Sequence, residues 1–544
     1  MDKIRHIFAA LNRRERIALA ISALLVAGSA VGLSVFFVVT TTRVVPASGG
    51  AYREGVVGQP KAVNPVFAVA EPDTDLVRLT FSNLAELAER VESDAAKRVW
   101  NVRLKEGLLW SDGSKLTSDD AIFTVERIQD PESRSPFFSS WQGVTAQRMS
   151  ELEIQFTLVA PYPFFEEHLR RLYVVPKHIF AETPSTNWHL SDYMLAPVGS
   201  GPYRFKKYDR KSNGFITAYH LEPNPHYSQA PPYITEVSFL FFQNENELID
   251  AFNSGALDGF GTFDDALLSP LARPYRLTEF TLPSYYAVFL NQSQNLALKD
   301  PDVRNALGLA TDRARLVKEI LHGHGDPASD PVVPHRAERA TVSFASANAL
   351  LDAAGWQRGA DGVREKKVKG GAIRLEFTLT APDIPLLAKT AGSLEDAWRD
   401  IGVKLALRLV SPNDVSQKIL KTRDYQALLF GNVVIPPRDL YPFWHSNERF
   451  YPGLNLSLYS SKRADQLMEQ VRRDPEGIDQ KLEALRGIIA GDAPAVFLFS
   501  PHYLLVTRKD VSGIPSAPIG EPEDRFLTLP KWYVKTTRTR VTGT

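Results

Sequence analysis

The most regular hydrophobic pattern in the chain lies between residues 100 and 128. Apolar and polar residues alternate from Trp100 to Leu104, which is the period of a half-buried strand. A tight-turn dipeptide, Asp112-Gly113, follows, and residues 121–128 repeat apolar side chains with a helical period. Thr117 stands where an N-cap belongs, and two aspartates follow it in the first turn, where carboxylates favour the helix dipole. The pattern predicts a strand, a turn and a capped helix, with no catalytic group among them.

A longer apolar run begins at Ile17 and ends at Val39, without one charged residue. Its helix would be roughly 35 Å long at about 1.5 Å per residue, enough for a hydrocarbon layer of about 30 Å. Five basic residues precede it: Lys3, Arg5, Arg13, Arg14 and Arg16. The positive-inside rule therefore predicts a cytoplasmic N-terminus at residues 1–16, a transmembrane anchor, and an extracytoplasmic remainder that begins with a linker at residues 40–51.

A cleaved signal peptide is the alternative interpretation of the same run. The apolar part of a signal peptide usually has about 7–15 residues, which is shorter than this one. Ala47-Ser48-Gly49 nevertheless offers small residues at which cleavage could leave a mature end near Gly50. The length of the run favours a retained anchor.

Beyond the linker, short apolar or alternating runs are mixed with amphipathic helical segments. The runs at residues 152–158, 237–242, 286–290 and 373–379 predict strands, and those at 302–321, 345–354 and 464–472 predict helices. This mixture indicates an α/β protein, and 544 residues predict two or three domains rather than one core.

Composition excludes several classes of protein. The 63 basic and 63 acidic residues give no net charge, which argues against nucleic acid as the main partner. The absence of cysteine excludes disulfides, thiolate metal sites, cysteine nucleophiles and a lipid-modified N-terminal cysteine. The 30 Phe, 18 Tyr and 8 Trp residues are compatible with an aromatic-lined cleft, but they fit a large core equally well.

The segment LKEGLLWSDGSKLTSDDA, from Leu104 to Ala121, resembles the motif Leu-Arg-x-Gly-x-x-Trp-x-Asp-Gly-x-x-Leu-Thr-Ala-x-Asp-Val. That motif belongs to the solute-binding protein family 5, the dipeptide- and oligopeptide-binding components of ABC importers. Lys105, Ser118 and Ala121 depart from it.

Further motifs of the same family follow in the family's order. They are Gly199-Ser200-Gly201-Pro202-Tyr203, Asn224-Pro225-x-Tyr227, Gly255-x-x-Asp258, Asn291, Asp302-Val303-Arg304-x-Ala306, Asp312-Arg313, Ala353-Ala354-Gly355-Trp356 and Asp424-Tyr425. The resemblance thus covers most of residues 52–532. It implies an α/β periplasmic-binding-protein type II fold, with two lobes joined by crossing strands and a third domain inserted in the first lobe. The expected boundaries are residues 52–83, 196–290 and 503–533 for lobe one, 84–195 for the insertion and 291–502 for lobe two.

Catalytic and metal-binding patterns are weak. There is no P-loop, no dinucleotide-binding glycine motif, no His-Glu-x-x-His and no nucleophile elbow, because Pro202 follows Gly199-Ser200-Gly201. His322-Gly323-His324, near Asp326 and Asp330, fits a metal site or a plain loop. Asp264-Asp265 reads as a solvated turn rather than an acid/base pair. We expect no enzyme and no cofactor.

The resemblance implies instead a cleft in which an extended peptide pairs its backbone with strand edges, between aromatic walls. The candidate ligand-binding residues are Asn64, Phe67, Trp141, Tyr285, Tyr286, Gly431, Asn432, Arg438, Asp439 and Trp444. In relatives an acidic residue of this last region takes the α-amine of the peptide.

Here Val433, Val434 and Ile435 occupy that region, and the next acid is Asp439. A buried ammonium group without a counter-charge is costly. Either Asp439 or another residue takes the amine, or the ligand has no ordinary free N-terminus. The apolar run also fits a buried crossing strand.

The resemblance implies a monomeric, extracytoplasmic, membrane-anchored substrate-binding protein that delivers oligopeptides to an ABC permease. A nickel chelate or a glycan is an alternative ligand. A surface-anchored interaction module that has lost transport is an alternative function.

Overall fold

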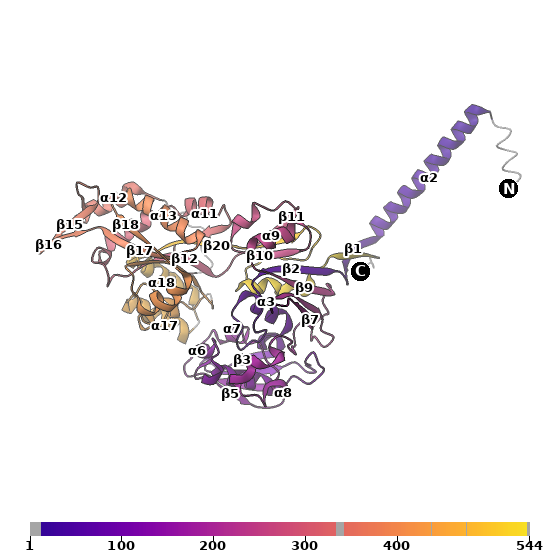
Figure 1. Ribbon diagram of the computed structural model, residues 1–544, viewed down its shortest axis with the longest axis horizontal. Coiled ribbons are helices and arrows are strands. Elements are labelled where there is room, and N and C mark those ends of the chain that lie inside the picture. The colour runs from indigo at the N-terminus through magenta and orange to yellow at the C-terminus, as the bar shows by residue number, and fades with distance from the viewer. Residues whose placement is uncertain (1–11, 333–341, 437, 475, 541–544) are drawn as a thin grey trace.

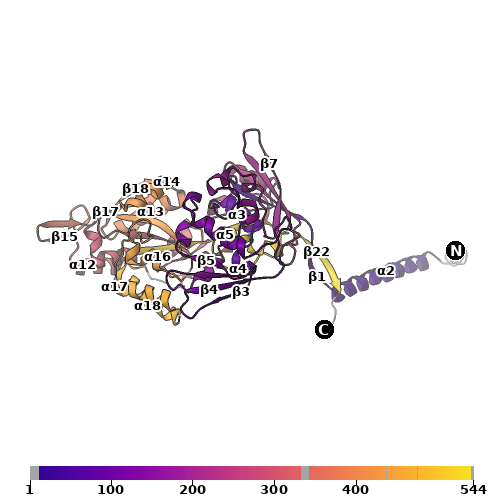
Figure 2. The ribbon, with the colours of Figure 1, turned by 90° about the horizontal axis from the view of Figure 1, so that it is seen from below.

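Two mixed β-sheets, each covered by helices, form the two main bodies of the molecule (Figure 1). The structure is a computed structural model, and it describes residues 12–332, 342–436, 438–474 and 476–540. The apolar helix α2 (Arg13–Thr41) projects away from both bodies (Figures 1 and 2).

The first lobe, residues 51–83, 196–280 and 503–533, contains a seven-stranded sheet in the order β11-β21-β10-β2-β9-β8-β7. Parallel pairing of β2 with β9 and β10 puts β2 at its centre, although β21 comes from the far end of the chain. The strands are β2 (Ala51–Val57), β7 (Tyr203–Arg210), β8 (Ile216–Pro223), β9 (Glu236–Phe242), β10 (Gly259–Thr262), β11 (Tyr275–Phe280) and β21 (Tyr503–Arg508). Helices α3 (Glu71–Thr80) and α9 (Glu245–Asn253) and the 3-10 helix η8 (Pro522–Lys531) accompany it.

The second lobe, residues 284–501, contains a six-stranded sheet in the order β13-β20-β12-β19-β17-β18. Its strands are β12 (Ser284–Leu290), β13 (Gly325–Pro327), β17 (Glu376–Pro382), β18 (Lys404–Val410), β19 (Ala427–Val433) and β20 (Ala495–Pro501). Its helices are α10 (Pro301–Leu309), α11 (Arg313–Ile320), α12 (Phe344–Ala353), α13 (Pro385–Arg399), α14 (Pro412–Asp414), α15 (Leu420–Thr422), α16 (Tyr441–Trp444), α17 (Lys462–Arg473) and α18 (Ile478–Asp492). A small sheet of β14 (Gln357–Arg358), β15 (Arg364–Val368) and β16 (Gly371–Arg374) extends from its far side.

The chain changes sheets earlier than expected. Lobe one was expected to continue to Leu290, but β12 pairs with β19 and β20 in the second sheet. The first crossing therefore lies at residues 281–283, and the second lies at His502, between β20 and β21. A run of apolar residues does not say which sheet a strand will join, because both sheets bury such strands.

The inserted domain, residues 84–195, lies beside the first lobe (Figure 1). Its four-stranded sheet has the order β3-β4-β6-β5, from β3 (Ala88–Ser93), β4 (Val99–Leu104), β5 (Thr145–Arg148) and β6 (Glu153–Thr157). Its helices are α4 (Leu84–Leu87), α5 (Ser118–Gln129), α6 (Phe138–Trp141), α7 (Phe165–Leu169) and α8 (Lys177–Phe180). The predicted strand, turn and helix are confirmed, and Thr117 caps α5 in a reciprocal capping box with Asp120.

Two predicted elements are interrupted in the structure. The helix expected over residues 302–321 is two helices, because the Asp312 side chain accepts a hydrogen bond from the Arg315 backbone and starts α11 anew. The strand expected over residues 373–379 divides at Leu375 between the small sheet and β17. In both cases the apolar periodicity of the sequence continues although the regular secondary structure is interrupted.

The glycines of the motif at residues 199–203 have a packing role. A Cβ on Gly199 would lie 1.8 Å from the backbone oxygen of Thr80, and one on Gly201 would lie 2.6 Å from that of Leu79. The turn therefore presses its backbone against the end of α3, which only glycine permits.

Residues 40–51, which the sequence predicted as a linker, contain a strand. β1 (Thr42–Ala47) follows α2 directly and pairs antiparallel with β22 (Lys535–Arg540), from Thr42 opposite Arg540 to Ala47 opposite Lys535. We call this two-stranded element the terminal ribbon. It brings the C-terminal strand beside the end of α2, as both views show (Figures 1 and 2).

Candidate functional site

A cavity of about 1080 Å³ lies against the first lobe and the inserted domain. Its wall draws on strand ends of the first sheet, on α3, on the start of η8 and the two residues before it, and on α4, β3, α6 and α7 of the inserted domain. Of the described residues of the second lobe, Ile435 and Pro436 contribute to the lining. The cavity is thus enclosed by three parts of the chain that are far apart in sequence.

Acidic side chains dominate the charged part of the lining. Nine carboxylates contribute, against three arginines. The acids are Glu71, Glu86, Glu89, Glu166, Glu167, Glu245, Glu521, Glu523 and Asp524, and the bases are Arg90, Arg170 and Arg171. This imbalance favours a ligand that carries positive charge.

Several of these carboxylates already have cationic partners. Glu86 accepts a 2.7 Å hydrogen bond from Arg78, Glu166 one of 2.7 Å from Arg170, and Glu521 pairs with Arg171. Among the described residues, Glu245 and Glu523 have no ion pair within 4.0 Å. They are the lining acids best placed to meet a cationic group of a ligand.

Glu523 is the more unusual of the two. Burial, and then the neighbouring Glu521 and Asp524 carboxylates, raise the pKa of Glu523 to about 7. Like charges near a partly desolvated carboxyl favour its protonated form. A cation bound beside Glu523 would relieve this repulsion, so the site is poised to gain from a positive ligand.

Beneath this wall lies a fully buried ionic cluster. The Arg525 guanidinium donates to Asp75 at 2.8 and 2.5 Å and to Glu54 at 3.1 Å, and all three side chains are inaccessible to solvent. Tyr52 donates to the other oxygen of Glu54 at 2.5 Å, and the Phe526 ring lies 4.2 Å from the guanidinium. The cluster ties β2, α3 and η8 together, and so holds the acidic segment at residues 520–524 in place.

Three predicted ligand-binding residues form a buried triad instead. The Tyr285 hydroxyl accepts hydrogen bonds from the Asn432 amide and the Trp444 indole, each 3.1 Å long. Tyr285 and Trp444 are completely buried and Asn432 is 6% exposed. The triad joins β12, β19 and α16 inside the second lobe, away from the cavity lining.

Asn64 and Phe67 also serve local packing. The Asn64 side chain accepts a hydrogen bond from the Val66 backbone, which fixes a turn before α3, and Asn64 is 1% exposed. The Phe67 ring meets the Trp188 ring edge-on at 6.0 Å. Neither side chain lines the cavity, whereas their neighbours Pro65 and Ala68 do.

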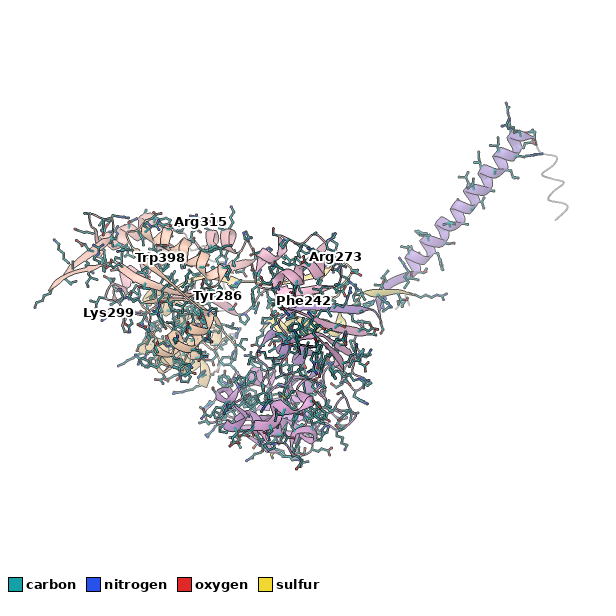
Figure 3. The ribbon with its side chains drawn as sticks, in the orientation of Figure 1. Phe242, Arg273, Tyr286, Lys299, Arg315 and Trp398 are labelled. Carbon is teal, nitrogen blue, oxygen red and sulfur yellow. The ribbon has the colours of Figure 1, made fainter. Side chains whose placement is uncertain are left out.

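Tyr286 and Gly431 lie opposite each other on β12 and β19. A Cβ on Gly431 would lie 2.9 Å from the Tyr286 ring, so the glycine makes room for the tyrosine. Figure 3 places Tyr286 on the side of the second lobe that is nearer to the first lobe. Trp141 is the single member of the predicted set that lines the cavity, where its ring packs 5.8 Å from that of Phe165.

Asp439, the predicted substitute for the missing acid, already has partners. It is 1% exposed and accepts hydrogen bonds from the Arg472 guanidinium at 2.7 and 2.9 Å and from the Tyr162 hydroxyl at 3.0 Å. Arg438 instead points outward and pairs with Asp479 at 3.2 Å. Neither residue lines the cavity. The sequence suggested that Asp439 could anchor a ligand, and in the structure it contacts Arg472 and Tyr162.

The run of three apolar residues before Asp439 is only partly buried. Val434 is fully buried, Val433 is 50% exposed, and Ile435 lines the cavity. The second lobe therefore presents an uncharged surface where relatives were expected to present a carboxylate.

His322 and His324 lie between the lobes. His322 pairs with Asp265 of the first lobe, and His324 lies 3.1 Å from a Glu279 oxygen at the end of β11. His502 contacts Glu279 at 2.8 Å and Asp326 at 3.0 Å. Among the described residues no group of three or more His, Cys, Asp or Glu side chains is arranged to hold a metal ion. The histidines therefore contact carboxylates near the lobe crossings, and Asp265, expected in a solvated turn, is one of these carboxylates.

Sequence reasoning missed the acidic wall formed by Glu71 and the segment at residues 520–524. The local signal was the run Gly520-Glu521-Pro522-Glu523-Asp524, which is dense in acids. Nothing in the sequence places that run across a cavity from residues 83–91.

Comparisons with known proteins agree with this architecture. The family model described as "Bacterial extracellular solute-binding proteins, family 5 Middle" matches residues 84–450, about two thirds of the chain. The oligopeptide-binding protein AppA of Bacillus subtilis is 24% identical over 517 residues, which cover 90% of this chain and 92% of AppA.

Solved structures share the fold. The structure of Bacillus subtilis AppA in complex with a nonapeptide has a TM-score of 0.69 at 22% identity, with 90% of this chain and all of AppA covered. The ABC transporter substrate-binding protein CtaP of Listeria monocytogenes has a TM-score of 0.75 at 23% identity, with the same shares covered. The type II binding-protein fold that the motifs implied is thus confirmed.

The match across residues 84–450, together with the ordered motifs and the two-lobed architecture, shows that this chain belongs to the bacterial extracellular solute-binding proteins, family 5.

Proposed function

We propose that the protein is the substrate-binding component of an ABC importer and captures oligopeptides in the cavity beside the first lobe. The observation that carries the proposal is the cavity itself. At about 1080 Å³ it slightly exceeds the range of roughly 300–1,000 Å³ typical for small-molecule pockets, which leaves room for more than one amino acid.

The architecture supports capture by lobe closure. Most of the described wall comes from the first lobe and the inserted domain, and the second lobe contributes Ile435 and Pro436. Rotation of the second lobe about the crossings at residues 281–283 and His502 would cover a ligand held on the first lobe. A ligand stabilises such a closed state only through its higher affinity for that state.

The lining favours peptides with positive charge. Because no described carboxylate of the second lobe lines the cavity, Glu523 and Glu245 of the first lobe are the candidates to receive an α-amine or a basic side chain. Ile435 and Pro436 would then contact apolar parts of the ligand.

Anchoring by α2 completes the proposal. None of the side chains in its apolar window is buried in the protein, and a helix that is apolar all round needs a non-aqueous environment. The protein would thus sit outside the cytoplasmic membrane as a monomer and pass its ligand to a permease in that membrane. An intact Met1 in protein extracted from membranes supports the anchor, whereas a mature end near Gly50 excludes it.

The deciding experiment measures ligand binding. Full-length protein is purified in detergent, unfolded to release bound ligand for mass spectrometry, and titrated calorimetrically with the peptides found and with a mixed peptide library. Ala85→Trp, which places a large ring in the cavity, should weaken or abolish binding, and Ala372→Trp on the exposed face of β16 should not.

The same titration separates the alternatives. Binding of metal chelates or glycans alone would change the ligand class within the family. No ligand of any kind would favour an interaction module, and peptide hydrolysis that one substitution abolishes would indicate an enzyme.

A further inference from the structure

The terminal ribbon is a concentration of positive charge at the base of α2. Four cations lie on its two strands: Arg43 on β1, and Lys535, Arg538 and Arg540 on β22. All six residues of β22 are exposed, and neither strand contains an acidic residue. Among the described residues, none of these four cations has an acidic partner within 4.0 Å.

The ribbon cannot lie far from the end of α2. No residue separates Thr41, the last residue of α2, from Thr42, the first of β1. At about 3.4 Å per residue the whole ribbon is roughly 20 Å long, and Arg540, opposite Thr42, lies at its near end. The Arg538 guanidinium also donates a 3.2 Å hydrogen bond to the Thr42 hydroxyl, which holds β22 against the helix end.

We propose that the terminal ribbon lies on the outer membrane surface and binds the anionic phosphate groups of lipid headgroups. The inference rests on the anchoring part of the proposed function, because α2 must span the membrane to place the ribbon there. The headgroup layer is about 5–8 Å thick on each side, so the near end of a ribbon that starts at the helix end lies at headgroup depth.

The basic residues that would set the orientation of α2 lie in a different part of the sequence from most of those that would bind the outer membrane surface. Basic residues near a transmembrane helix influence its orientation. Five such residues precede the apolar run from Ile17 to Val39, whereas only Arg43 and Arg53 follow it within about 15 residues. The other three cations of the ribbon come from the C-terminal end of the chain, far outside the window of about 15–20 residues that governs orientation. The outer surface thus gains charge without weakening the signal that sets the topology.

Binding along the ribbon would limit how the lobes move relative to the membrane. A single helix end leaves the attached body free to tilt and rotate, whereas a second contact up to roughly 20 Å away restricts both motions. Each basic residue near an anionic surface adds on the order of fivefold to the attraction, and salt weakens it within a Debye length of about 10 Å.

The test uses the absence of cysteine from the chain, which makes Thr537→Cys a unique labelling site on β22. The full-length protein, labelled with a fluorophore there, is inserted into nanodiscs that contain nitroxide-headgroup lipid as a quencher. One disc type is otherwise phosphatidylcholine and the other is rich in phosphatidylglycerol. Lys369→Cys at the far end of the second lobe provides a reference label.

We expect at least about twofold more quenching at residue 537 in the anionic discs, and loss of that difference when salt rises from about 50 to about 500 mM. The K535Q/R538Q/R540Q variant should lose the difference, R538K/R540K should keep it, and K367Q/K369Q/R408Q should behave as the wild type. Equal quenching in both disc types, or a difference that the triple glutamine variant retains, overturns the inference.

Alkaline extraction of each sample distinguishes a failure of the membrane anchor from a failure of the ribbon inference. A protein that resists extraction but has lipid-independent quenching contradicts the ribbon inference and leaves the anchor intact. A protein that is extracted contradicts both. Equal thermal midpoints of the variants establish that the substitutions on β22 leave the fold intact.

Discussion

The Tyr162 hydroxyl donates a 3.0 Å hydrogen bond to the Oδ2 atom of Asp439. This contact joins the inserted domain to the second lobe, beside the cavity-lining His168, whose ring lies 5.4 Å from that of Tyr162. Because Arg472 holds the same carboxylate at 2.7 Å, the three side chains form a partly buried bridge between the two bodies. Both carboxylate oxygens of Asp439 thus have partners within the protein.

Asp439→Asn should destabilise the protein by about 2–3 kcal/mol, because it leaves Arg472 and Tyr162 facing a neutral group in a site with little solvent. Denaturant unfolding followed by tryptophan fluorescence measures the loss. The adjacent Arg438→Gln is the control: its ion pair with Asp479 is exposed, so the change should stay below about 0.5 kcal/mol. A larger effect of the control than of Asp439→Asn would contradict the bridge.

Glu523→Gln should lower the affinity for peptides with a free amine or a basic side chain about tenfold, and leave amine-blocked neutral peptides unaffected. Calorimetry at pH 8 measures both. Since the pKa of Glu523 is about 7, wild-type affinity for cationic peptides should fall as pH drops below 7 and the carboxylate is neutralised.

The same substitution should stabilise the free protein above pH 7. An acid whose folded pKa is raised favours folding while it is protonated, and that contribution is lost as pH rises through about 7. The Gln variant does not ionise, so its thermal midpoint should exceed that of the wild type at pH 8. The exposed Glu182→Gln should change neither affinity nor midpoint.

His502 should stabilise the lobe crossing at acidic pH. Its hydrogen bond to Asp326, and then that to Glu279, raise the pKa of His502, although partial burial opposes them. The stabilisation is fully present below about 6.5, the ordinary value for histidine, and is lost as pH rises through the higher folded value. His502→Gln should therefore be less stable than the wild type at pH 6, and the gap should narrow by pH 8. A gap that widens with pH would contradict this assignment.

His168 should have the opposite effect. Burial, and then the nearby Arg171, lower the pKa of His168 to about 4. In the unfolded chain His168 is protonated as pH drops below about 6.5, whereas in the folded chain it stays neutral until about pH 4. Wild-type stability should therefore fall as pH drops from about 6.5 to 4. His168→Gln should reduce this fall, which denaturant midpoints across that pH range would measure.

Gly199→Ala should cost at least about 3 kcal/mol or prevent folding, because the new Cβ would lie 1.8 Å from the Thr80 backbone oxygen. Gly392→Ala in α13 is the matched control. Its Cβ would meet nothing within 4 Å, so removal of a helical glycine should be neutral or stabilise by up to about 1 kcal/mol. Chemical unfolding of the two variants measures the contrast.

The sequence predicted correctly those elements that depend on interactions between neighbouring residues. The capped helix α5 and the long apolar helix α2 both lie where the sequence placed them, since capping residues and a long uncharged run act over neighbouring residues. The terminal ribbon was missed because β22 is a polar, fully exposed strand, and only its pairing with β1, near the other end of the chain, makes it a strand.

The partners of the candidate site residues were harder to predict than the fold. Asp439 looked available because its partners lie 33 and 277 positions away, at Arg472 and Tyr162. Tyr285, Asn432 and Trp444 have side chains typical of a cleft, yet they satisfy one another in the core. Tyrosine and tryptophan are suited both to a ligand-binding cleft and to the protein core, and only their neighbours in the folded structure show which of these they occupy.

The position of β21 has a consequence for the order of events during synthesis and export. This strand lies between β10 and β11, so the sheet of the first lobe stays divided until residues 503–508 have been made. Pairings so distant in sequence form slowly, which keeps the earlier strands available for passage through the membrane as an unfolded chain. A truncation before residue 503 should therefore yield a chain that is exported but remains open to proteases, while the second lobe, complete by residue 501, can already fold.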